Sequence, residues 1–200
     1  REDTFSDLFL MPGLRGKTFG LAIIYICCVT SYIGISALTM TEEAETQTRL
    51  VIILACLDIP ASLLAWYLLE SKLGRRWTDV LGLLICGFAL MVPAIFQSQN
   101  LSDPIASWSV YVARFAIAMV YMIVYQHSSE LFPTTLRNQG MGVCATIGAT
   151  FGIFSSYFLA LAHYGAWLPL LITSIICLIA AVFGLFLPET LNEFLPERAE

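Results

Sequence analysis

An acid and a base seven residues apart, Glu130 and Arg137, enclose a proline between two long apolar segments. Pro133 has no N–H and disfavours helix for the residue before it, so one helix should end near Phe132 and another begin close by. Opposite charges at such a junction can pair with charges from neighbouring junctions and form a polar gate on one membrane face. A gate that closes and reopens favours a transporter.

Two more charges, Asp58 and Arg114, lie inside apolar segments. Each is eight residues into its segment, counted from Leu50 and Ala106, so at 1.5 Å per residue both lie roughly 12 Å deep. An isolated charge there costs about 2.5–3.5 kcal/mol, so pairing or contact with water is expected. The two residues line a polar cavity or form an ion pair that only joins two helices. We favour the cavity, because a buried pair adds little net stability.

Tyr32 lies near one end of the first apolar segment, followed by Gly34. Its ring and hydroxyl suit a ligand, including a cation–π contact with an ammonium group. Tyrosine near the end of a membrane helix is also an ordinary interfacial anchor. Both interpretations stay open on the sequence.

Sequence motifs typical of enzymes and metal sites are missing from the sequence. There is no GxSxG, HExxH or phosphate-binding glycine loop. The two histidines, His127 and His163, are expected at opposite membrane faces. All six cysteines lie in apolar segments without CxxC spacing, which argues against disulfides and zinc. We therefore expect no enzymatic activity, no cofactor and no metal.

The composition indicates a membrane protein, because 58% of the 200 residues are hydrophobic and only 12% are charged, against roughly 25% charged in soluble domains. A membrane helix needs about 20 apolar residues. Gly148 and Gly152 form a small-xxx-small pattern, which predicts close helix packing. We expect a lead-in segment (1–17), a six-span domain (18–187) and a tail (188–200). The predicted spans are 18–38, 50–69, 79–96, 105–125, 139–162 and 166–187.

Basic residues separate cleanly when the connections between the six spans are assigned alternately to the two sides. Only Arg49 falls on one side, and Arg114 lies within a span. By the positive-inside rule, both chain ends are therefore cytoplasmic. The basic residues on the cytoplasmic side are Arg1, Arg15, Lys17, Lys72, Arg75, Arg76, Arg137 and Arg198.

Several motifs, in order along the chain, resemble the C-terminal half of major facilitator superfamily transporters for organic cations, organic anions and carnitine. The resemblance covers essentially the whole chain. Arg114 and Tyr32-x-Gly34 also match basic and aromatic positions of the family. The motifs are Asp58-Ile59-Pro60-Ala61, Leu73-Gly74-Arg75-Arg76, Glu130–Asn138, Pro188-Glu189-Thr190-Leu191 and Leu195-Pro196-Glu197.

This resemblance implies an all-α membrane fold of six helices, an inverted 3+3 repeat that rocks against a second half in alternating access. The first, second, fourth and fifth spans would line the cavity. The implied substrate cavity contains Tyr32, Asp58, Arg114 and Ala149. The implied cytoplasmic gate consists of Glu70, Arg75, Arg76, Glu130, Arg137 and Glu189.

Ala149 is a departure from the family pattern. Relatives that carry cations tend to have an acidic residue at this position, and those that carry anions a basic one. The charge of the substrate therefore stays open. If Arg114 neutralises Asp58, zwitterions are plausible, whereas a dominant Tyr32 favours cations.

The leading interpretation is an organic cation/carnitine-like transporter of small organic ions or zwitterions, of which these 200 residues would be the C-terminal half. We expect a segment of a longer protein, with a short complete chain as the alternative. Its partners would be the substrate, the lipid bilayer and the N-terminal six-helix half, without nucleic acid, in the plasma membrane. The alternative function is a truncated or degenerate relative that does not transport.

Overall fold

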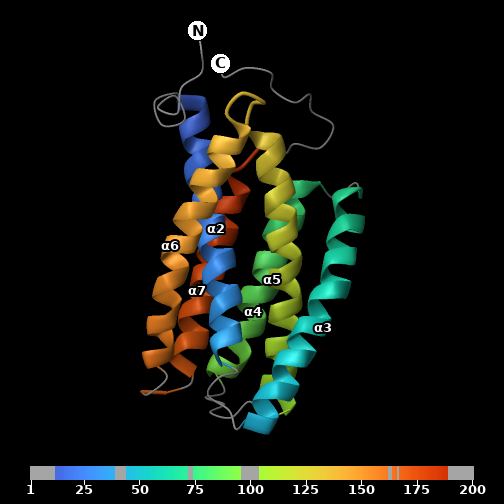
Figure 1. Ribbon diagram of the computed structural model, residues 1–200, viewed down its shortest axis with the longest axis vertical. Coiled ribbons are helices and arrows are strands. Elements are labelled where there is room, and N and C mark those ends of the chain that lie inside the picture. The colour runs from blue at the N-terminus through green and yellow to red at the C-terminus, as the bar shows by residue number, and fades with distance from the viewer. Residues whose placement is uncertain are drawn as a thin grey trace.

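Six long helices run alongside one another in the computed structural model (Figure 1). The structure describes residues 12–38, 44–71, 74–95, 104–161, 164–165 and 167–188, and every regular element in them is helical. The all-helical fold expected from the sequence is confirmed. The helices are α2 (Pro12–Leu38), α3 (Ala44–Leu69), α4 (Arg75–Ile95), α5 (Pro104–Leu131), α6 (Arg137–Leu161) and α7 (Trp167–Leu185).

Five of these helices are long and apolar enough to cross a membrane, judged over the described residues. The exception is α6, although a span was predicted over 139–162. The described part of α6 begins with the polar residues Arg137, Asn138 and Gln139, and some residues of its apolar end lie outside that part. A helix whose polar and small residues face other helices can still cross the bilayer, because lipid contacts only part of its surface.

Packing is uneven across the bundle. Helix α2 contacts α5, α6 and α7, and α4 packs on both α5 and α7. Helix α3 packs mainly on α5 and leaves large apolar side chains such as Leu63 and Trp66 exposed. The position of α3 in this chain therefore depends chiefly on its contact with α5.

The contact of α6 with α2 needs small residues. A Cβ atom at Gly148 would lie 3.0 Å from the carbonyl oxygen of Tyr25, and one at Gly152 would lie 2.6 Å from Val29 Cγ1. These distances confirm the predicted small-xxx-small packing.

The turn after α5 follows the proline prediction closely. Helix α5 ends at Leu131 and α6 begins at Arg137. Within the turn, Leu136 N–H donates to the Pro133 carbonyl at 3.1 Å, while the buried Phe132 ring lies against the first turn of α6. A Cβ at Gly140 would lie 2.8 Å from that ring.

This contact makes Gly140 and Gly142 a matched pair for testing the junction. We expect Gly140→Ala to lower the melting temperature of the purified protein by about 3 °C, because overpacking costs about 1–3 kcal/mol. Gly142→Ala meets no atom within 4 Å and should leave the melting temperature unchanged or raise it, since alanine favours helix. Equal effects of the two substitutions would contradict the assigned contact.

Candidate functional site

Asp58 on α3 and Arg114 on α5 form a two-point ion pair in the middle of the bundle. Arg114 Nε donates to Asp58 Oδ1 at 3.1 Å, and Arg114 Nη2 donates to Asp58 Oδ2 at 2.9 Å. This paired geometry suits a planar guanidinium and a carboxylate. The charges that the sequence placed at one depth therefore meet.

Helix α2 completes the surroundings of the pair. Arg114 Nη1 donates to the Tyr32 carbonyl at 3.2 Å and to Ser36 Oγ at 2.9 Å. The Tyr32 hydroxyl donates to Asp58 Oδ2 at 2.8 Å, and the guanidinium carbon lies 3.5 Å from the centre of the Tyr32 ring. All three guanidinium nitrogens thus have acceptors, and one buried cation links three helices.

A cavity of about 340 Å³ opens beside this cluster. The Asp58 side chain is 29% exposed and the Arg114 side chain only 5%, so the carboxylate faces the open side and the guanidinium lies behind it. Ring centres of Tyr32 and Tyr121 are 6.1 Å apart along the wall. The residues lining the cavity are Val29, Tyr32, Ile33, Asp58, Ser62, Ala118, Tyr121 and Met122.

Only two of the four expected cavity residues line the cavity directly. Tyr32 and Asp58 line the cavity directly, and Arg114 supports them from the protein side. Ala149 is exposed on α6 and is not among the lining residues. Within this chain, the lining comes from α2, α3 and α5.

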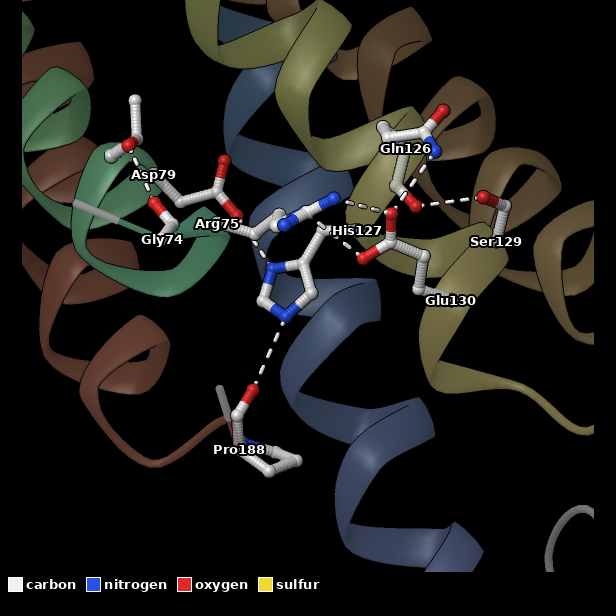
Figure 2. Close-up of polar contacts among 9 residues, drawn as sticks. Gly74, Arg75, Asp79, Gln126, His127, Ser129, Glu130 and Pro188 are labelled. Carbon is white, nitrogen blue, oxygen red and sulfur yellow. Dashed lines mark hydrogen bonds and ion pairs between the residues drawn. The ribbon is translucent and has the colours of Figure 1, made fainter. Parts of the chain in front are cut away.

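Arg75 and Glu130 pair where α4 begins and α5 ends (Figure 2). Arg75 Nε lies 3.0 Å from Glu130 Oε2, and Arg75 Nη2 donates to Glu130 Oε1 at 3.1 Å. Gln126, one turn before Glu130 on α5, also donates to Oε1 at 3.1 Å. Two members of the expected cytoplasmic gate therefore meet.

Other members of the expected gate do not join this pair in the described part of the chain. Arg76 lies over the Trp77 ring, 5.6 Å from its centre. Glu70 is exposed just after α3. The Nε and Nη2 atoms of Arg137 are buried without a hydrogen-bond partner among the described residues. Glu189 lies outside the described residues.

Sequence reasoning missed a second polar contact at this end, between Asp79 on α4 and His127 on α5. His127 Nδ1 lies 2.8 Å from Asp79 Oδ2, and both side chains are 1% exposed. Helical spacing contains a signal for it. His127 and Glu130 are three residues apart on α5, and Arg75 and Asp79 are four apart on α4, so each pair shares a helix face. The contact that joins Arg75 to Glu130 thus also brings Asp79 to His127.

Known proteins similar to this chain are transporters. Residues 8–200 match the family described as "Sugar (and other) transporter". The chain is 30% identical over 194 residues to organic cation/carnitine transporter 2 of Mus musculus, covering 97% of this chain and 34% of the relative. It is 30% identical over 200 residues to organic cation transporter 1 of Caenorhabditis elegans, covering 100% and 34%.

A relative named for anions is similar to the same degree. Organic anion transporter 3 of Homo sapiens is 30% identical over 197 residues, covering 98% of this chain and 36% of the relative. The chain thus spans about a third of the length of the curated relatives it matches. From the family match over nearly all of its residues, the chain belongs to the sugar (and other) transporter family of the major facilitator superfamily.

Proposed function

We propose that the full-length protein moves small organic ions or zwitterions across the plasma membrane by alternating access, and that this chain is its C-terminal six-helix half. The observation that carries the proposal is an acidic side chain held at the wall of a membrane-embedded cavity. Charged groups within the bilayer are costly, so they mark substrate and ion pathways. The family membership supports the same function.

The exposure of the two charges favours substrates with an ammonium group. A positive group entering the cavity reaches the partly exposed Asp58 carboxylate and the ring of Tyr121. The Asp58 oxygens accept three hydrogen bonds from Arg114 and Tyr32, but a carboxylate has about four acceptor sites, and this one is partly exposed. An anion instead finds the Arg114 nitrogens bonded and the side chain only 5% exposed. The bound substrate would therefore be an organic cation, or a zwitterion whose anionic group contacts the other half.

The two ends of the bundle would have different roles. We place both chain ends in the cytoplasm, on the strength of the distribution of basic residues. The Arg75–Glu130 pair, together with Glu70, Arg76, Arg137 and Glu189, would then hold the cytoplasmic gate closed while the cavity faces outward. Exposed apolar side chains on α3 and α6 suit contact with lipid and with the N-terminal half.

Removing the charge of Asp58 tests the substrate assignment. In cells expressing the full-length protein, we expect Asp58→Asn to reduce uptake of labelled organic cations at least about tenfold, equivalent to about 1.4 kcal/mol. Met122→Leu, at another position of the same wall, is the control and should retain uptake. Normal cation uptake by Asp58→Asn at equal surface expression would exclude the carboxylate from the site. No uptake of cations, anions or zwitterions by the surface-expressed wild type would favour the non-transporting alternative.

Exchanging the charges of Arg75 and Glu130 tests the gate. We expect Arg75→Glu and Glu130→Arg each to slow turnover about fivefold or more, because like charges then face each other across the junction. Substrate affinity should change little, since neither residue lines the cavity. The double variant should recover part of the rate. Equal losses of affinity and rate, or a double variant no better than the single ones, would contradict the gating role.

A further inference from the structure

The Asp79–His127 pair has a third partner at the end of α7. His127 Nε2 lies 3.3 Å from the carbonyl oxygen of Pro188, while Nδ1 lies 2.8 Å from Asp79 Oδ2 (Figure 2). Pro188 follows the last turn of α7, and the neighbouring Leu187 is buried. One imidazole ring thus joins α4, α5 and the exit of α7.

Both ring nitrogens of His127 face acceptor oxygens. A neutral imidazole carries one N–H and can donate to only one of them. The other nitrogen would then direct a lone pair at an acceptor oxygen, which is a repulsive contact. Only the doubly protonated imidazolium donates to Asp79 and Pro188 together, and its charge also compensates the buried carboxylate.

The helices packed around this pair carry the following charged and titratable groups. On α4, Arg75 lies one turn from Asp79 and is engaged by Glu130 of α5. Helix α2 contributes the thiol of Cys28 and the Tyr25 hydroxyl, which is bonded to Ser128 at 3.1 Å. Helix α7 has no charged residue over Trp167–Leu185. Arg15, Lys17, Glu70, Arg76 and Arg137 belong to the same end of the bundle, at less buried positions.

We propose that Asp79 and His127 form a proton-binding site that controls how the end of α7 packs against α4 and α5. This end, residues 186–188, is called the α7 exit below. With the proton bound, the imidazolium holds the Pro188 carbonyl against α4 and α5. When the proton leaves, the contact with Pro188 is lost, and the last turn of α7 with Pro188 is released from α4 and α5. The site uses no cavity residue and is separate from the substrate site. An effect on the gate would rest on the proposed transport function, whereas the proton site itself does not.

The first test is the pH dependence of stability in the purified full-length protein. Unfolded histidine loses its proton between about pH 6 and 8. If the folded site binds the proton as proposed, the stabilisation is complete at low pH and is lost as pH rises. We expect the wild-type melting temperature to fall by about 3 °C more over this range than that of Asp79→Asn or His127→Gln. Glu130→Gln, which removes the neighbouring ion pair, should retain the wild-type slope. The same slope in His127→Gln and wild type would overturn the proposal.

The second test follows the α7 exit directly. Phe186 and Leu187 amides donate to Phe183 and Gly184 carbonyls in the last turn. After correction for intrinsic exchange rates, their hydrogen-exchange protection should fall about tenfold between pH 7 and 10 in the wild type. In His127→Gln it should be low at both pH values. Protection independent of pH in the wild type would exclude release of the exit.

A spectroscopic measurement keeps the proposal testable if the variants do not fold. Histidine labelled with ¹⁵N in the wild-type protein should show an imidazolium signal that persists at pH 7.5, where exposed histidines are neutral. Absence of such a signal would overturn the proposal. None of these readouts measures uptake, so a failure of the proposed transport would be seen separately.

Discussion

A guanidinium buried in a membrane bundle must have partners, and Arg114 obtains them from three helices. Its two hydrogen bonds to Asp58 join α5 to α3, and its hydrogen bonds to the Tyr32 carbonyl and Ser36 join α5 to α2. Removing one partner of such a pair costs about 3–5 kcal/mol, because the other charge is left buried. The placement of α3, the shape of the cavity wall and the exposure of the Asp58 carboxylate all depend on this cluster.

The other end of α5 shows the same use of charge at a helix contact. Glu130 and His127 share one face of α5, and Arg75 and Asp79 share the facing side of α4 (Figure 2). The first pair is partly exposed, with side chains 19% and 17% accessible, whereas the second is almost fully buried. Neighbouring pairs on the same two helices therefore differ in their access to water, which suits one to open and close and the other to hold a proton.

The sequence predicted most of the fold because helix length and apolar composition are local properties. The common depth of Asp58 and Arg114 followed from residue counting, and Pro133 indicated the break between α5 and α6. Partners contributed by distant helices were harder to predict. The Asp79–His127 pair needed the relative rotation of α4 and α5, which only packing determines. The position of Ala149 relative to the cavity depended on how α6 sits on α2, for the same reason.

The peripheral position of α3 within this chain has a consequence for which positions tolerate substitution. Helix α3 supplies Asp58 and Ser62 to the cavity wall, yet within this chain it packs mainly on α5 and buries few side chains. Substitutions at lightly packed positions cost little stability. By contrast, α6 meets the α2 backbone at Gly148 and the Val29 side chain at Gly152, where an added Cβ would be crowded. Within this chain, the exposed positions of α3 other than Asp58 therefore tolerate substitution better than the α2–α6 contact.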